Sequence, residues 1–201
     1  LDKKLVLLLT NDTASSNNKF LTYSEKDLQS PPGEADSMYV FEGYKVYQIA
    51  EPNFNDLTDP DQARLIFQSD LNNGISEIYN WEKFPGDLGA TPVYIPTLKV
   101  DGADKGVSSS LAVTEDQFAE GDRNLVNHKT YYFVAIAYAY NNYQQFNTLD
   151  ASGQKSAYLE GRRNVLITTG IPRIPTPEFG GITLNADYGD GAVITRFDGE
   201  G

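Results

Sequence analysis

Residues 130–140, TYYFVAIAYAY, decide the fold class of this chain. Side chains of a β-strand alternate between its two faces, so Tyr131 and Phe133 would point to one side and Tyr132 and Val134 to the other. Both sets are apolar, and a strand with two apolar faces is typical of the centre of a sheet that is covered on both sides. The stretch therefore predicts a central, fully buried strand.

Shorter apolar segments surround this strand and are separated by turn signals. They predict strands at residues 1–10, 38–49, 93–100, 107–114 and 163–169, with loops at 11–37, 51–61, 82–92 and 143–161. In 38–49 the period of two places Tyr44 and Val46 on one face. Pro96 makes 93–100 an edge strand or a bulged one.

Residues 62–69 fit either a short helix that begins at Asp59-Pro60 or a strand. The run Asn72-Asn73-Gly74 is a turn signal, and it predicts a hairpin between 62–69 and 75–79 if both are strands. Many short strands with almost no helical periodicity predict an all-β antiparallel sandwich with long loops.

The composition excludes several classes of function. The chain has 201 residues, which is enough for a core of its own, and a formal net charge of −12 without a basic patch. We therefore expect no nucleic-acid partner and no binding to anionic membranes. The absence of cysteine excludes thiolate zinc sites and thiol catalysis, and argues for a bacterial or an intracellular source. No apolar run reaches the length of a membrane-spanning helix, so direct membrane insertion is not expected.

A motif lies directly before the central strand. The run LVNHKTY, residues 125–131, resembles the Leu-x-Pro-x-Thr-x-Tyr pattern that opens the sixth strand of fibronectin type III domains, with Asn127 in place of the proline. The resemblance implies that Leu125 closes one end of the core. It also implies that Tyr131 buries its ring while its hydroxyl hydrogen-bonds to the backbone just upstream.

Two further segments carry the same resemblance. Residues 43–47, GYKVY, are similar to the family's third strand, with Tyr44 as a structural residue, and 163–169 are similar to its last strand. The phrase FEGYKVYQ, followed by an acidic loop, resembles the modules of Bacteroidetes secreted and cell-surface proteins that are often exported by type IX secretion. The chain departs from the family in lacking the first strand and the tryptophan of the second strand, and in carrying insertions at 11–37, 51–106 and 141–161.

These patterns predict an organisation and a role. We expect an immunoglobulin- or fibronectin type III-like sandwich at 1–170, a proline- and glycine-rich linker at 171–181, and the start of a following β unit or a tail at 182–201. The resemblance implies a non-catalytic, extracellular structural or adhesive module of a multidomain bacterial surface or secreted protein. Its partners would be the neighbouring domains of the same chain, other surface proteins or glycans.

Two alternatives belong to other classes of function. One is glycan binding through loop aromatics, for which the densest cluster is Tyr79, Trp81 and Phe84; the competing interpretation is that these rings pack the insertions onto the sandwich. The other is an accessory domain of a secreted hydrolase.

Metal binding and catalysis have weaker sequence support. Calcium could be held by oxygen ligands of Asp56, Asp59 and Asp61, although a solvated loop explains the same residues. The other acidic candidates are 101–104 and the set Asn185, Asp187 and Asp190. No enzymatic activity and no other cofactor are expected, because His128 is the one histidine, no nucleophile motif accompanies it, and no carboxylate pair stands out among 28 acidic residues.

Overall fold

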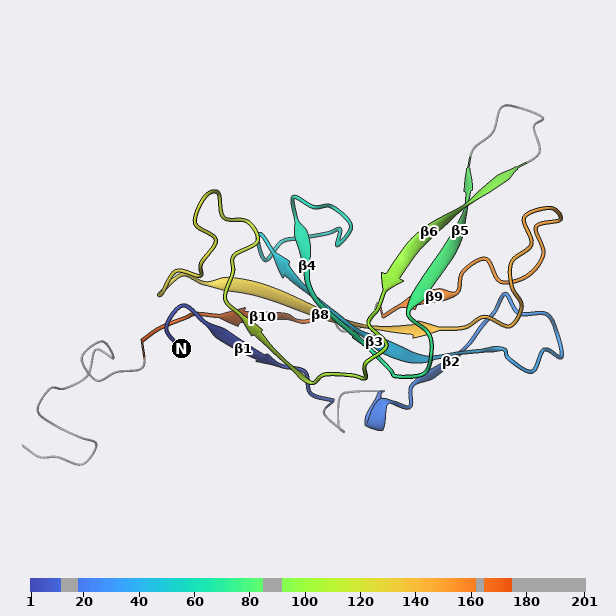
Figure 1. Ribbon diagram of the computed structural model, residues 1–201, viewed down its shortest axis with the longest axis horizontal. Helices are drawn as coiled ribbons and strands as arrows, with labels where there is room; N and C mark the ends of the chain where they lie inside the picture. The colour runs from blue at the N-terminus through green and yellow to red at the C-terminus, as the bar shows by residue number, and fades with distance from the viewer. Residues whose placement is uncertain (12–17, 85–91, 162–164, 175–201) are drawn as a thin grey trace, which may run out of the picture.

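The computed structural model describes residues 1–11, 18–84, 92–161 and 165–174, and they form an all-β antiparallel fold (Figure 1). The strands are β1 (Leu5–Leu8), β2 (Ser24–Lys26), β3 (Met38–Ile49), β4 (Ala63–Asp70), β5 (Glu77–Phe84), β6 (Val93–Asp101), β7 (Ser110–Val113), β8 (Tyr131–Tyr140), β9 (Tyr158–Glu160) and β10 (Ile167–Gly170). A single-turn 3₁₀ helix, η1, spans Lys19–Leu21. In this part of the chain no helix is long and apolar enough to cross a membrane. The all-β prediction is confirmed.

The long strands β3 and β8 form the centre of a six-stranded sheet. Its order is β10–β8–β3–β2, with β4 also paired to β3 and β9 also paired to β8. The strands β1 and β7 form a separate two-stranded sheet, and β5 and β6 form a hairpin that projects from the body (Figure 1). The six-stranded sheet and the β1–β7 pair enclose one core, as in a β-sandwich.

This core is built from the inward-facing residues of both sheets. The buried members are Val46, Leu111, Val113, Leu125, Tyr131 and Phe133, and Leu5, Leu7 and Leu9 pack against them. Successive core residues within β7 and β8 are two positions apart, which is the strand period. The same alternation sends Lys45 and Tyr47 of β3 to the opposite face of the sheet.

The opposite face of β8 is buried as well. Ile49, Ala63, Val134 and Ile136 form a second cluster, onto which Phe54 and Leu57 of the loop after β3 pack. A third cluster joins Tyr138 of β8 to Ile78 of β5 and Val100 of β6. Both faces of the central strand are thus covered, as its two apolar faces predicted, and the long insertions provide the second cover.

Several local predictions are corrected by the pairing. Residues 62–69 are a strand, because β4 completes a ladder along β3 rather than forming a helix. The turn after it is present, with Gly74 at φ +88°, but the predicted hairpin is wrong because β5 pairs with β6 and not with β4. Strand β5 extends to Phe84, so residues 82–84 of the loop expected at 82–92 are strand, and 85–91 lie outside the described residues. The loops predicted at 11–37 and 143–161 contain the short strands β2 and β9.

The chain after β10 stays on the sandwich as far as Arg173, three residues beyond the strand. Pro172 is fully buried, and its carbonyl oxygen accepts a hydrogen bond of 2.8 Å from the backbone N–H of His128. The backbone N–H of Arg173 donates to the carbonyl oxygen of Leu1 at 3.1 Å. The first residues of the predicted linker are therefore packed against the module, and 175–181 lie outside the described residues, as does 182–201.

Candidate functional site

The motif at 125–131 forms a buried corner at one end of the core. Leu125 is completely buried and Tyr131 is only 3% exposed. The Tyr131 hydroxyl oxygen accepts a hydrogen bond of 2.8 Å from the backbone N–H of Val126, which is the bond expected from the sequence motif. Tyr44 is also buried, and its hydroxyl accepts a hydrogen bond of 3.0 Å from the Asn18 amide. All three residues have structural roles, and none of them lines either of the two hollows described below.

The acidic loop at 56–61 uses its carboxylates to shape turns. Asp56 accepts hydrogen bonds from the backbone and the hydroxyl of Thr58, and these bonds lower the pKa of its carboxyl group. Asp59 accepts from the backbone N–H of Asp61 at 2.9 Å. Across the described residues, no three histidine, aspartate or glutamate side chains are grouped so that they could hold a metal ion. Calcium in this loop stays a prediction, and Asn185, Asp187 and Asp190 lie outside the described residues.

The third acidic candidate, 101–104, joins a buried polar cluster that the sequence did not reveal. Glu42 and Asp70 are fully buried. Asp70 accepts a hydrogen bond of 3.0 Å from the backbone N–H of Asp104, and Glu42 accepts one of 2.9 Å from the Asn73 amide. Burial raises the pKa of Glu42, and the neighbouring charges of Asp70 and Asp104 raise it further. These groups tie the turn after β4 to the turn after β6.

The single histidine and the serine that precedes β7 make local backbone contacts. His128 is exposed, lies in a turn with φ +67°, and uses its backbone N–H to bind Pro172. Ser108 donates its hydroxyl to the backbone of Ser110, at the start of β7. Both residues have local structural roles in the turn and strand that contain them.

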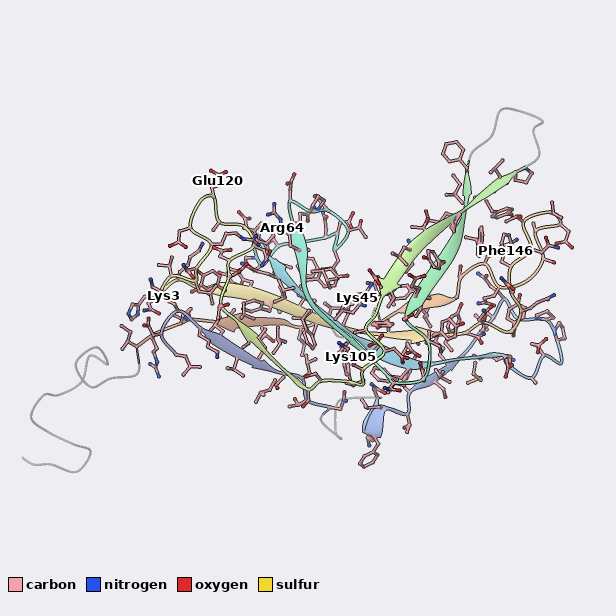
Figure 2. All side chains as sticks on the ribbon, viewed as in Figure 1. Lys3, Lys45, Arg64, Lys105, Glu120 and Phe146 are labelled. Carbon is pink, nitrogen blue, oxygen red and sulfur yellow. The ribbon has the colours of Figure 1, made fainter. Side chains whose placement is uncertain are left out.

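Three aromatic side chains from distant parts of the chain meet beside the projecting hairpin. The Trp81 ring of β5 lies 5.0 Å from the ring of Phe146, which in turn lies 5.1 Å from the ring of Tyr94 in β6. Phe146 belongs to the loop after β8, and Figure 2 places it next to the hairpin. The same loop region is fixed to β5 by a hydrogen bond of 2.7 Å from the backbone N–H of Trp81 to the Lys155 carbonyl oxygen.

Two of these rings, those of Trp81 and Phe146, border a hollow of about 440 Å³, which we call the aromatic cleft. Its lining residues are Glu77, Ile78, Tyr79, Trp81, Pro96, Tyr140, Asn142, Gln145, Phe146, Gln154 and Ala157. Of the three aromatics predicted to act together, Tyr79 and Trp81 line the cleft. Phe84 does not: it is 56% exposed near the end of the hairpin and, by alternation along β5, faces away from Trp81.

The sequence grouped Phe84 with Trp81 because the two are close along the chain. Phe146 takes that place in the structure although it follows Trp81 by more than sixty residues, and Tyr94 comes from the facing strand. Phe146 was one of several loop aromatics in the sequence, but no local pattern distinguished it from the others. The missing information was tertiary: β5 pairs with β6, which carries Tyr94, and the backbone of Trp81 bonds to Lys155 in the loop that carries Phe146.

A buried polar network supports the wall of the cleft. Asp27 is 2% exposed, and its Oδ2 atom accepts hydrogen bonds from Gln154 Nε2 at 2.8 Å and from Asn141 Nδ2 at 3.0 Å. The Tyr39 hydroxyl accepts from Gln154 Nε2 at 3.1 Å. Burial and the nearby charge of Asp27 raise the pKa of Tyr39 to about 12, so its hydroxyl stays protonated at neutral pH.

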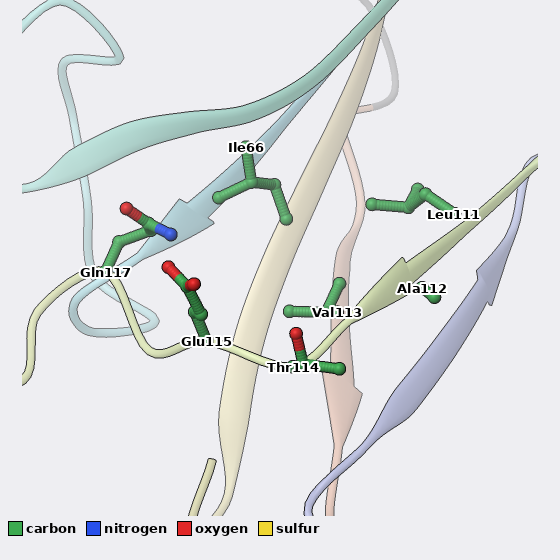
Figure 3. Close-up of a pocket in the computed structure, with 7 residues that line it drawn as sticks. All are labelled: Ile66, Leu111, Ala112, Val113, Thr114, Glu115 and Gln117. Atoms are coloured by element: carbon green, nitrogen blue, oxygen red, sulfur yellow. The ribbon is translucent and has the colours of Figure 1, made fainter. Parts of the chain in front are cut away.

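A second, smaller hollow of about 170 Å³ lies where the edges of the two sheets separate, between β4 and β7 (Figure 3). Ile66, Leu111 and Val113 form its apolar wall, and Glu115 and Gln117 lie at one side of it. It is an extension of the gap between the layers of the sandwich, and Thr114, Glu115 and Gln117 are its polar lining residues.

Comparison of the chain with protein-family models, curated proteins and solved structures finds no match.

Proposed function

We propose that this chain is a non-catalytic, extracellular module of a multidomain bacterial surface or secreted protein, and that it holds neighbouring domains in a fixed orientation. The role is structural or adhesive, and the fold is a fibronectin type III-like sandwich enlarged by insertions.

The strand order supports the proposed family resemblance. In immunoglobulin-like sandwiches the second and fifth strands share one sheet, while the third, sixth and seventh share the other. Here β1 pairs with β7, and β3, β8 and β10 lie side by side in the larger sheet. The corner formed by Leu125 and Tyr131 precedes β8, the counterpart of the sixth strand, which is where the family motif occurs.

The proposed role of orienting neighbouring domains, which we call the display role, rests on the fixed path of the chain after its last strand. Pro172 is buried, and backbone hydrogen bonds tie Pro172 to His128 and Arg173 to Leu1. The sandwich therefore fixes the path of the chain from the end of β10 to Arg173. This is what a module that orients a neighbour requires.

The proposal is tested on the native polypeptide in cells of the source organism. An antibody against the module should detect a polypeptide several times heavier than 22.2 kDa, and protease added to intact cells should remove the signal. A band near 22 kDa that is protected inside the cells would contradict the proposal. Sequencing the larger polypeptide also addresses the hydrolase alternative, because an accessory domain would share its chain with a catalytic domain.

A further inference from the structure

The aromatic cleft has an acceptor at its wall that the described residues leave unused. Gln154 is 2% exposed, and its Nε2 atom donates to Asp27 Oδ2 at 2.8 Å and to the Ser156 carbonyl oxygen at 2.6 Å. Both partners are acceptors only, so the amide nitrogen must face them and the orientation of the amide is fixed. The Gln154 Oε1 atom is left buried without a hydrogen-bond partner among the described residues.

A buried acceptor without a partner is costly, by about 1–3 kcal/mol. Gln154 lines the aromatic cleft, but its Oε1 atom is buried in the wall, so only a small donor that enters the wall, such as a hydroxyl group, can supply the missing hydrogen bond. The partner of Gln154 Oε1 must be a hydrogen-bond donor, because the bond from Nε2 to the Asp27 carboxylate prevents the amide from turning its N–H group towards the ligand. This favours ligands that carry hydroxyl groups.

The rest of the lining narrows the class of ligand. Tyr79, Trp81 and Phe146 offer ring faces and edges of the kind that pack on the C–H face of a sugar ring. Asn142 and Gln145 are exposed amides at the cleft, and each can both donate to and accept from hydroxyl groups.

The charge of the lining is also informative. Glu77 is the one charged residue among the lining residues, and its Oε2 atom accepts a hydrogen bond of 3.0 Å from the Tyr79 hydroxyl. With a carboxylate at the cleft and a chain charge of −12, an anionic ligand is repelled.

We propose that the aromatic cleft binds a neutral sugar unit of a polysaccharide. This inference does not depend on the display role, and its failure would leave that role standing.

The chain provides its own reporter for the test, because Trp81 is the single tryptophan of the sequence and lines the cleft. The probes are the neutral polysaccharides laminarin, xylan, galactomannan and hydroxyethyl cellulose, with polygalacturonate as the anionic comparison. Binding is measured by retardation in native gels that contain each polysaccharide and by titration of the Trp81 fluorescence.

The decisive variants are Tyr79→Ala and Phe84→Ala. Both residues are partly exposed aromatics of β5, but only Tyr79 lines the cleft, so Phe84→Ala is the matched control. Trp81→Ala removes more contact area, but it also removes the packing against Phe146, so Tyr79→Ala keeps the test clear of folding defects.

At least one neutral polysaccharide should retard the wild-type protein and Phe84→Ala equally and change the Trp81 fluorescence. Tyr79→Ala should bind it at least tenfold more weakly with an unchanged unfolding temperature, and polygalacturonate should not bind. The inference is overturned if no neutral polysaccharide binds, if polygalacturonate alone binds, or if Tyr79→Ala binds as tightly as Phe84→Ala.

Discussion

Replacement of Tyr131 by phenylalanine tests whether the corner before β8 stabilises the sandwich. The substitution keeps the buried ring and removes only the hydroxyl oxygen, which accepts the Val126 N–H at 2.8 Å. No cavity larger than one oxygen atom is created, so the cost is that of the lost hydrogen bond and of the N–H group left beside an apolar ring.

The magnitude follows from these two terms. A hydrogen bond of this kind contributes about 0.5–1.5 kcal/mol, and a buried donor without a partner costs about 1–3 kcal/mol. Because Tyr131 is 3% exposed but Val126 is at the surface, water can partly compensate, and we expect a loss of about 2 kcal/mol. For a domain of this size, about 2 kcal/mol corresponds to a fall in unfolding temperature of about 4–8 °C.

The assay is thermal and urea unfolding followed by circular dichroism. Tyr79→Phe is the control, because the Tyr79 hydroxyl bonds to Glu77 at the surface, and its removal should leave the unfolding temperature unchanged. If Tyr131→Phe unfolds at the wild-type temperature, or if Tyr79→Phe is destabilised as much, the hydrogen bond from Val126 to Tyr131 does not stabilise the fold.

Two further substitutions test the packing around β3. Gly43→Ala would place a methyl carbon 2.6 Å from the Tyr138 hydroxyl oxygen and closer still to a backbone carbonyl oxygen of β4. We therefore expect the free energy of unfolding, measured with urea, to fall by about 2 kcal/mol or more. A variant as stable as the wild type would show that the sheet is loosely packed at this position. Glu42→Gln should raise the free energy of unfolding at pH 7 by about 1 kcal/mol, because the pKa of Glu42 is raised by burial and by Asp70 and Asp104. A raised carboxyl pKa gives stability that is present below pH 4.5 and is lost as the pH rises, so the advantage of Glu42→Gln should shrink as the pH falls from 7 towards 4.5; an advantage independent of pH would contradict this.

Local patterns in the sequence were sufficient for the central elements. The alternation in 130–140 predicted β8 and its burial on both faces, because the strand period and the apolar character of each face are properties of consecutive residues. Strand β3 was predicted with the bounds that it has, 38–49. The hydrogen bond between Tyr131 and Val126 spans five residues, so a short motif could specify it.

The tertiary structure alone decided which strands pair and which distant side chains meet. The turn signal at Gly74 predicted a change of chain direction but not the pairing partner of β5. In the structure β4 pairs with β3, and β5 pairs along its whole length with β6. The aromatic cleft depends on that choice, because β6 supplies Pro96 to its lining, and on the backbone bond from Trp81 to Lys155, which holds the loop of Phe146 against β5. The bond from Gln154 to Asp27 joins residues 127 positions apart, and no local period in a sequence encodes a contact that forms only when two sheets and their insertions have closed around it.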